Sequence, residues 1–283
     1  MTAQWDTVTI VGVGLIGGSA GLALAKRGAA NKIIGVGRSD SSLAAAKELG
    51  AISEGTTNIR EGVANADFVL VATRVSVIGD QLEEIDACIR PGTPITDAGS
   101  TKQSIVDRWE QSRSSRKGRF VGSHPLAGSH KRGPQAAAPA LFEDKLTVLT
   151  PVESTPKTDT ESIATFWQLI GAQVCHLSPS EHDLLLASAS HAPHVIAAAL
   201  ATATPREAHR FTAGGWRDTT RIAAGDPNLW ADILLDNAQA VTTQIENFSQ
   251  ASDQLRRAIE AGDRPTLIKL LTLAKESRDA LGS

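Results

Sequence analysis

Cysteine, basic charge and long apolar runs are all scarce in this sequence of 283 residues. Its two cysteines, Cys88 and Cys175, stand far apart and outside any metal-ligand spacing, which predicts reduced thiols rather than a disulfide or a metal site. With a net charge of -3, the chain has no basic excess to neutralise a phosphate backbone, so nucleic acid is not an expected partner. No basic and apolar leader opens the chain, and no apolar run approaches the roughly 18 residues that a membrane span needs. We therefore predict a soluble cytoplasmic protein that binds no membrane.

A glycine-rich turn follows the first apolar run and precedes an alanine-rich segment with helical spacing. The turn reads Gly12-x-Gly14-x-x-Gly17. Gly12 makes the tight turn, Gly14 allows a pyrophosphate to approach the backbone, and Gly17 lets the helix pack on the strand. The first N–H groups of the helix then face the phosphates. Such turns also occur without a ligand, but the order of strand, turn and helix predicts dinucleotide binding here. The expected cofactor-binding residues of the turn are Gly12, Gly14, Leu15, Ile16 and Gly17.

Tyrosine is absent altogether, which narrows the enzymes that share this turn. Short-chain dehydrogenases bind a dinucleotide on the same kind of turn and use a tyrosine as acid and base. This chain has none to offer, so that class is excluded.

The residue type just after the second expected strand, Lys32–Val36, indicates whether NAD or NADP is preferred. A site that prefers NAD usually places an Asp or Glu there, which accepts a hydrogen bond from the ribose 2′-hydroxyl. Here Gly37 takes that position, and Arg38 and Ser39 could hold a 2′-phosphate. Alternatively, Arg38 is a solvated charge and Asp40 caps the next helix. We favour NADP over NAD on the basis of this loop.

Three further strands are expected to end at the same edge of the sheet. Residues 67–72 form an apolar run typical of a central parallel strand, and Thr73 follows at the expected cofactor edge. A short strand at 95–97 precedes Ser100, and another precedes His124. Ligands of open α/β sheets bind where the strands end, so Ser100 and His124 are candidate site residues. Each has a structural alternative, since Ser100 could cap the helix that follows it and His124 could serve packing alone.

The strand pattern ends in the second half of the chain. Strands at Leu146–Thr150 and Gln173–Leu177 flank a helix, and from Ser180 onward only helical periodicity remains. Glycine-rich breaks divide the helices at 214–215, 225–227 and 262–265. The predicted fold is an N-terminal Rossmann-type α/β domain with a doubly wound sheet over residues 1–177, followed by an all-α C-terminal domain over 178–283.

Two groups of polar residues in the helical half are candidates for chemistry. His191 and His194 lie three residues apart, hence on one helix face, and Pro193 should kink that helix. They could bind zinc, but no further ligand stands at a familiar spacing, so we expect no metal, and a polar helix contact is the alternative. Arg217 and Arg221 lie one helical turn apart, which suits a carboxylate ligand unless both are solvated.

Five motifs in the right order resemble those of the prephenate and arogenate dehydrogenases of tyrosine biosynthesis, over nearly the whole chain. They are similar to that family's Gly-x-Gly-Leu-Ile-Gly-Gly-Ser turn, Asp-x-Gly-Ser-x-Lys, His-Pro-Met-Ala-Gly with Leu126 in the Met place, Ser-His-x-Pro-His, and Asp-x-Thr-Arg-Ile-Ala with a following Asp-Pro-x-x-Trp. In this sequence the motifs occupy residues 12–19, 97–102, 124–128, 190–194 and 218–230. Together they are far more specific than any one of them.

The resemblance implies the NAD(P)-dependent oxidative decarboxylation of a 4-hydroxycyclohexadienyl substrate. His124 would bind the substrate 4-hydroxyl and take its proton as hydride leaves C4 for the nicotinamide, which suits the pKa of histidine. Ser100 would orient the same hydroxyl, and Arg221 would hold a substrate carboxylate. The other positions that match the family's substrate pocket are Asp183, His191, His194, Gly214 and Trp230. The resemblance also implies a homodimer through the helical domain, and apolar helices such as 267–273 need such a partner surface.

One departure from the family bears on the substrate. Where the family often has Thr or Ser followed by Glu after His-Pro-x-Ala-Gly, this chain has Ser129 followed by His130, Lys131 and Arg132. We expect the basic residues to favour prephenate, a keto acid, over arogenate, which carries an ammonium group. Because the chain ends soon after the helical domain, we expect no appended regulatory module or fused mutase.

Two other classes of function remain. A β-hydroxyacid dehydrogenase would share the architecture but needs a catalytic lysine in the helical domain, and none stands near His191. A non-enzymatic dinucleotide sensor would keep the glycine turn and need neither His124 nor Arg221.

Overall fold

The first half of the chain folds into an eight-stranded sheet in the order β3-β2-β1-β4-β5-β6-β7-β8. The computed structural model describes residues 3–111, 115–129, 131–280 and 282. The strands are β1 (Trp5–Val11), β2 (Ala30–Val36), β3 (Glu54–Thr56), β4 (Phe68–Val71), β5 (Pro94–Asp97), β6 (Arg119–Pro125), β7 (Leu146–Thr150) and β8 (Gln173–His176). Neighbouring strands run parallel except β6 and β7. This order, winding outward from β1 in both directions, confirms the predicted Rossmann-type domain.

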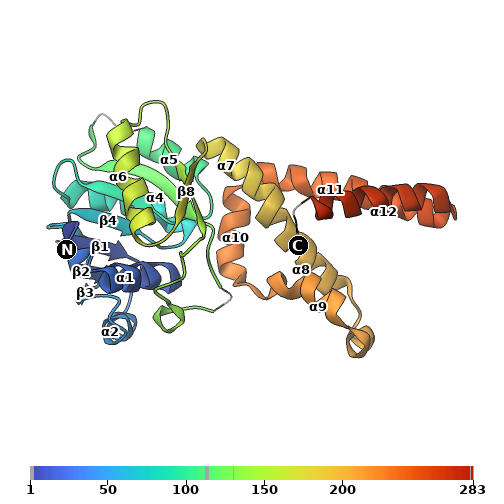
Figure 1. Cartoon of the computed structure of the whole chain (residues 1–283), viewed down its shortest axis with the longest axis horizontal. Coiled ribbons are helices and arrows are strands. Elements are labelled where there is room, and N and C mark those ends of the chain that lie inside the picture. Colours follow the sequence, from blue (N-terminus) through green and yellow to red (C-terminus); the bar gives the residue numbers. More distant parts are fainter. Residues whose placement is uncertain (1–2, 112–114, 130, 281, 283) are drawn as a thin grey trace.

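Helices cover both faces of the sheet (Figure 1). They are α1 (Leu15–Arg27), α2 (Asp40–Glu48), α3 (Ile59–Val63), α4 (Val75–Cys88), α5 (Gln103–Glu110) and α6 (Lys157–Leu169). Side chains of α1, α2 and α6 fill one buried core, and those of α3, α4 and α5 fill the other. The strand between them, β4, is buried along its whole length, as its uninterrupted apolar run predicts.

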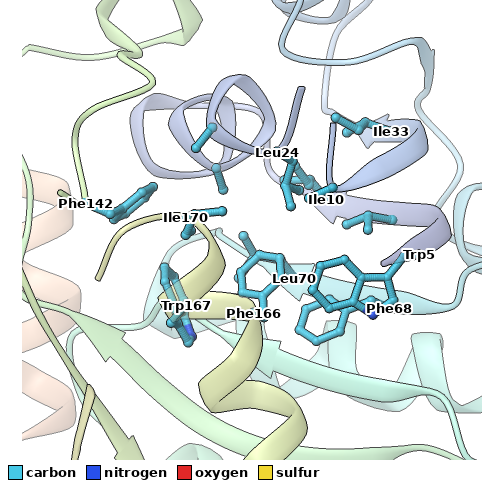
Figure 2. Packing of buried hydrophobic residues seen from close by; sticks show 14 of the residues in the cluster. Trp5, Ile10, Leu24, Ile33, Phe68, Leu70, Phe142, Phe166, Trp167 and Ile170 are labelled. Atoms are coloured by element: carbon cyan, nitrogen blue, oxygen red, sulfur yellow. The ribbon is translucent and has the colours of Figure 1, made fainter. Parts of the chain in front are cut away.

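A cluster of aromatic side chains lies in the core beneath α1 and α6 (Figure 2). Phe68 of β4 stacks on Phe166 of α6 with ring centroids 4.3 Å apart, and Trp5 of β1 lies 5.3 Å from Phe68. Trp167 is fully buried beside Phe166 and contacts Phe142 edge to face. Each buried aromatic side chain contributes roughly 1.5–3 kcal/mol, so this cluster fixes α6 against the middle of the sheet.

The second half of the chain is helical, as the sequence predicts. Its elements are α7 (Pro179–Leu186), the π-helical turn η3 (Ala187–His191), α8 (Ala192–Ala203), η4 (Arg206–Phe211), α9 (Gly214–Thr220), η5 (Arg221–Ala224), α10 (Pro227–Asp236), α11 (Ala238–Glu260) and α12 (Arg264–Asp279). In Figure 1, α11 and α12 lie side by side and project away from the sheet. The glycine-rich breaks at 214–215, 225–227 and 262–265 fall at the starts of α9, α10 and α12.

Three local features differ from the sequence-based expectation. The short edge strand β3 was not expected, because Glu-Gly-Thr carries no apolar pattern. A further break at Asn237 separates α10 from α11 without any glycine or proline. The turn before Pro193 is π-helical, which the sequence did not indicate, because the Ala192 N–H donates to the carbonyl of Ala187.

The run from α7 to α8, Pro179–Ala203, is long and apolar enough to cross a membrane by length and composition, with a mean hydropathy of 1.5. Sequence inspection found no apolar run of that length, because polar residues interrupt the stretch. Length and composition alone are weak evidence for a membrane span.

Helix α10 connects the helical half to the sheet domain. Its Ile233 is buried in the core beneath α4 and α5. Asp232 accepts a hydrogen bond from Ser76 at 2.7 Å and lies 3.6 Å from the guanidinium of Arg74, both at the start of α4. Asp236 accepts from the hydroxyl of Ser104 on α5 at 2.8 Å. These contacts place α10 across the edge where β4 and β5 end.

We expect Gly17→Ala to lower the free energy of unfolding by roughly 2 kcal/mol, because a Cβ there would lie 2.0 Å from the carbonyl oxygen of Gly12. Gly14→Ala is the matched control, since a Cβ at that position meets nothing within 4 Å. Urea denaturation of both variants measures the difference, and equal stabilities would contradict the packing role of Gly17.

Candidate active site

A cavity of about 1100 Å³ lies where the ends of the sheet strands meet the helical half. Eleven of the candidate cofactor-binding, catalytic and substrate-binding residues line it. They are Gly12, Gly14, Leu15, Ile16, Arg38, Ser39, Thr73, Ser100, His124, Arg221 and Trp230. The fold therefore brings the glycine turn, the two strand-end candidates and the arginine of the helical half into one space.

The glycine turn has the geometry that a dinucleotide requires. Gly12 adopts φ +96°, and a Cβ there would lie 2.6 Å from the carbonyl oxygen of Ala72. Gly14 stands in open space at the start of α1, and no side chain caps that helix. The first N–H groups of α1 are thus left for a phosphate ligand. Gly17 does not line the cavity but packs α1 against the turn.

The loop after β2 is open to solvent. Arg38 and Ser39 are exposed and line the cavity, and Arg38 has no ion pair among the residues that the structure describes. Ser39, rather than Asp40, is the N-cap of α2, because its side chain accepts from the Ser42 N–H. The alternative in which Asp40 caps the helix is therefore wrong, while a solvated Arg38 remains compatible with the geometry.

His124 lies at the end of β6 and heads a chain of hydrogen-bonded side chains. Its Nδ1 is 2.9 Å from Nε2 of His182, and Nδ1 of His182 is 2.8 Å from Oδ1 of Asp183. A carboxylate only accepts, so His182 donates through Nδ1, and with a neutral ring it accepts through Nε2. His124 must then donate from Nδ1, which leaves its Nε2 unprotonated and able to accept a proton.

Burial keeps this histidine uncharged. Burial lowers the pKa of His124 well below its usual value, and the neighbouring His182, Lys102 and His191 lower it further. Burial also lowers the pKa of His191 to about 4, against the opposing effect of Asp183. His124 is therefore a free base across the neutral range, as a general base must be.

Asp183 stands behind His182 rather than in the cavity. Its two oxygens accept the backbone N–H groups of Lys102 and Gln103 at 2.8 and 2.9 Å, so that this α7 side chain caps α5. Burial raises the pKa of Asp183, but the hydrogen bonds from His182 and those two N–H groups outweigh it and leave the pKa below its ordinary value. Ser100 is accordingly not the cap of α5, which removes that structural alternative.

Sequence inspection missed His182. It is fully buried and belongs to no motif that was used to choose site residues. Its position beside Asp183 in the run Glu181-His182-Asp183 was visible, but nothing in the spacing showed that the pair would face His124, 58 residues away.

The remaining candidates of the helical half divide into two groups. Arg221 and Trp230 line the cavity, whereas His191, His194 and Gly214 do not. His194 stacks on the indole of Trp230 with ring centroids 3.5 Å apart, so it supports that wall from behind. His191 lies 3.2 Å from the side-chain amide of Asn237, which also donates to the carbonyl of Asp183 at 2.7 Å. Gly214 is exposed at the start of α9.

The basic loop after β6 reaches the cavity. His130 lies outside the described residues, while Lys131 and Arg132 line the cavity wall. Arg132 forms an ion pair at 3.0 Å with Asp226, the N-cap of α10. Within the described ranges, no cluster of three His, Cys, Asp or Glu side chains could hold a metal ion.

A dinucleotide-binding sheet whose cavity also contains an uncharged histidine and an arginine is the site of an NAD(P)-linked oxidoreductase. The family description "Prephenate dehydrogenase, nucleotide-binding domain" matches residues 20–176, and "Prephenate dehydrogenase, dimerization domain" matches residues 178–273. The chain belongs to the prephenate dehydrogenase family. The glycine turn precedes the matched residues, so its assignment rests on the geometry above.

Curated relatives and solved structures agree with this membership. A prephenate dehydrogenase from Bacillus subtilis is 38% identical, over 99% of this chain and 77% of the relative. A cyclohexadienyl dehydrogenase from Zymomonas mobilis is 33% identical, over 97% of this chain and 95% of the relative. The crystal structure of prephenate dehydrogenase from Aquifex aeolicus with hydroxyphenyl propionate and NAD⁺ superposes with a TM-score of 0.89, at 33% identity over 98% of both chains.

We expect Asp183→Asn to lower the free energy of unfolding at pH 7 by about 1–3 kcal/mol, because an amide nitrogen would face one of the donors that the carboxylate accepts. The difference from the wild type should shrink as the pH falls through the lowered pKa of Asp183, since the protonated acid also loses an acceptor. Asp263→Asn is the matched control, because an exposed asparagine caps α12 as well as an aspartate does. Equal losses in the two variants, measured by urea denaturation, would contradict the capping role of Asp183.

Proposed function

We propose that the protein oxidises and decarboxylates prephenate to 4-hydroxyphenylpyruvate with a nicotinamide dinucleotide as hydride acceptor. The observation that carries this proposal is the placement of His124, an uncharged histidine whose free ring nitrogen is Nε2, in the same cavity as the glycine turn and Arg221. The names of the relatives from B. subtilis and A. aeolicus support the choice of substrate.

His124 is the side chain that exchanges a proton with the substrate. A bound nicotinamide supplies the acceptor for the hydride that leaves C4 of the substrate. His124 accepts the proton of the 4-hydroxyl at Nε2, so that the oxygen on C4 becomes a carbonyl. When the bond from C1 to its carboxylate breaks, CO₂ leaves and the electron pair completes the aromatic ring. His124 then returns the proton to the C4 oxygen, and the product is a phenol.

The other lining residues hold the substrate for this transfer. Ser100, in the turn after β5, would orient the 4-hydroxyl toward His124, and Arg221 would bind a carboxylate through its planar guanidinium. Trp230 would form an apolar wall for the ring, with His194 stacked behind it. Asp183 and His191 act from behind this layer, the first through His182 and the second through Asn237. Gly214 remains a proposal drawn from the family motif alone.

NADP is the cofactor we favour. Gly37 leaves no acidic side chain to select a ribose 2′-hydroxyl, and the exposed guanidinium of Arg38 borders the cavity beside the hydroxyl of Ser39. A 2′-phosphate would gain charge-assisted hydrogen bonds there. Thr73, on the facing loop after β4, would border the cofactor on its other side.

Prephenate rather than arogenate is the substrate we favour. Prephenate carries two carboxylates and a keto group, whereas arogenate replaces the keto group with an ammonium. Lys131 adds positive charge to the cavity lining that also contains Arg221, which disfavours an ammonium nearby, whereas the charge of Arg132 is paired with Asp226. Because one relative is a cyclohexadienyl dehydrogenase, a preference for arogenate is the alternative outcome of the test.

A cytoplasmic homodimer is the form we propose for the enzyme. The family description of the helical half as a dimerization domain supports it. Exposed apolar side chains on α11 and α12 support it as well, namely Phe248, Ile259, Ile268, Leu271 and Leu273. Sedimentation equilibrium at micromolar concentration would distinguish the dimer from a 29.7 kDa monomer.

Steady-state kinetics with the two substrates test the proposed function. We expect kcat/KM to be at least tenfold higher for prephenate than for arogenate, because the basic loop repels the arogenate ammonium. Formation of reduced nicotinamide, followed by its absorbance, gives both values under the same conditions. A clear preference for arogenate would reverse the substrate assignment, and no turnover of either would contradict the enzymatic function.

His124→Asn should lower kcat by at least about 10²-fold, the scale of losing a general base. Affinity for the dinucleotide should stay at the wild-type value, because the glycine turn is untouched. Isothermal titration with the cofactor and initial rates with prephenate measure the two effects. Wild-type turnover in this variant would remove His124 from the mechanism.

Arg38→Ala should raise KM for NADP at least fivefold and leave KM for NAD nearly unchanged, because only the phosphorylated cofactor loses a charge-assisted hydrogen bond. Arg206→Ala, a change in a basic residue of η4 outside the cavity lining, is the control. A wild-type enzyme that strongly prefers NAD would contradict the assignment.

A further inference from the structure

Lys102 is a lysine with no exposed surface, and the proposed mechanism does not use it. It lies in the turn between β5 and α5. Its ammonium forms an ion pair with the carboxylate of Asp97, the last residue of β5, and donates to the carbonyl oxygen of Ser123 at 3.0 Å. Burying an ammonium is unfavourable, and pairing with further hydrogen bonds is needed to offset the lost hydration; this ammonium has both. Lysine is rarely found at a fully buried position, because an apolar side chain could fill the same space.

The ion pair holds the backbone that carries His124. The ladder between β5 and β6 ends at the pair Thr96 and Val121. Beyond it, the N–H of Ser123 donates to Oδ1 of Asp97 at 3.0 Å, and the carbonyl of Ser123 accepts from Lys102. The carbonyl of Ser123 belongs to the peptide bond that joins it to His124. Two side chains thus continue the ladder to the residue before the histidine.

Ser123 itself is held from further directions. Its hydroxyl accepts from the indole N–H of Trp167 at 2.9 Å and lies 2.7 Å from the hydroxyl of Thr96. The backbone of Ser123 could therefore be kept in place by packing and neutral hydrogen bonds. A neutral side chain of similar length at position 102 would suffice for that purpose, so the charge of Lys102 calls for another explanation.

We propose that Lys102 is a positioning residue for the reaction, whose buried ammonium fixes the peptide before His124 and keeps the imidazole of His124 in its uncharged, proton-accepting form. The proposal rests on the proposed function, in which His124 is the base. Because a fixed positive charge close to an imidazole disfavours a second positive charge on the ring, Lys102 and His124 are coupled.

The charged and titratable groups around His124 come from every element packed on it. His182 of α7 and His191 of η3 face it from the helical half, with Asp183 behind His182. Lys102 faces it from the sheet domain, with Asp97 paired to the ammonium and accepting from the N–H of Ser123. The cavity side carries Arg221.

The balance of these groups favours the uncharged imidazole. Burial has the largest effect on the pKa of His124, and His182, Lys102 and His191 add to it in the same direction. Burial likewise lowers the pKa of Lys102 itself, while Asp97, Asp183 and Asp236 oppose that change and favour the ammonium. Since Lys102 is the fixed cation among the groups that lower the pKa of His124, its removal should make His124 easier to protonate.

The test is the pair of variants Lys102→Met and Lys102→Met/Asp97→Asn. Methionine is one heavy atom shorter than lysine and carries no charge. The double variant leaves no unpaired buried carboxylate, so it is expected to fold even where the single variant does not. The acid limb of the kcat/KM profile with prephenate should move to higher pH by about one unit in each variant that folds. A purely structural role would lower the rate at every pH without moving the limb.

Lys117→Met is the matched control. Lys117 is exposed, and its ammonium also donates to a backbone carbonyl, that of Ala87 at 2.9 Å. The same substitution there removes a similar hydrogen bond far from the cavity, so its profile should coincide with that of the wild type.

Titration of the His124 ring by NMR gives a readout that needs no turnover, with His124→Asn used to assign the signal. An upward shift of the His124 pKa in both Lys102 variants supports the proposal, even if prephenate proves not to be the substrate. A wild-type titration curve for His124 in the folded double variant would overturn it. The absence of turnover in the wild type, with the shift still present, would contradict the proposed function alone.

Discussion

The carboxylate of Asp183 is the contact on which the site depends. It belongs to the helical half, yet it accepts the first N–H groups of α5 in the sheet domain. The same carboxylate orients His182, which in turn fixes the tautomer of His124. One side chain therefore joins the two halves of the molecule and determines which nitrogen of the base is free. Since the oxygen that accepts from Lys102 also faces His182, a shift of α7 relative to α5 would disturb the base itself.

Much of this arrangement could be predicted from the sequence, because it follows from where strands end. The apolar runs and the glycine turn indicated a doubly wound sheet, and the residues just after β2, β4, β5 and β6 do meet at one cavity. The family resemblance implied a place for Asp183 in the substrate pocket, whereas its carboxylate lies behind His182, which sequence inspection missed. Local spacing carries no information about a contact between residues about 80 positions apart, such as that of Asp183 with Lys102 and Gln103. The break at Asn237 was missed for the same reason, since its amide is committed to the distant Asp183 and His191 rather than to a turn.

The electrostatics of the cavity separate its two tasks. Its outer wall carries basic side chains from several elements, and they suit ligands that are anionic. These are Arg38, Arg74, Lys131, Arg132 and Arg221. Deeper in the protein, Lys102 and Asp97 form a buried ion pair, and burial lowers the pKa values of His124 and His191, which keeps both imidazoles neutral. The residues that attract an anionic ligand are thus different from the base that accepts the proton. Because the base is uncharged, it does not compete with the arginines for the ligand's negative charge.

Helix α10 belongs to the helical half in the sequence, but in the folded protein it packs into the core of the sheet domain. The chain passes from sheet to helices near residue 177, but Ile233 is buried in the core that α4 and α5 form. The core of the sheet domain is therefore complete only when Ile233, about 50 positions past that boundary, packs into it. A fragment ending at the boundary would expose an apolar hollow in place of Ile233, and neither half could be exchanged for that of a distant relative without matching this one helix. The two halves have separate architectures but share one unit of folding.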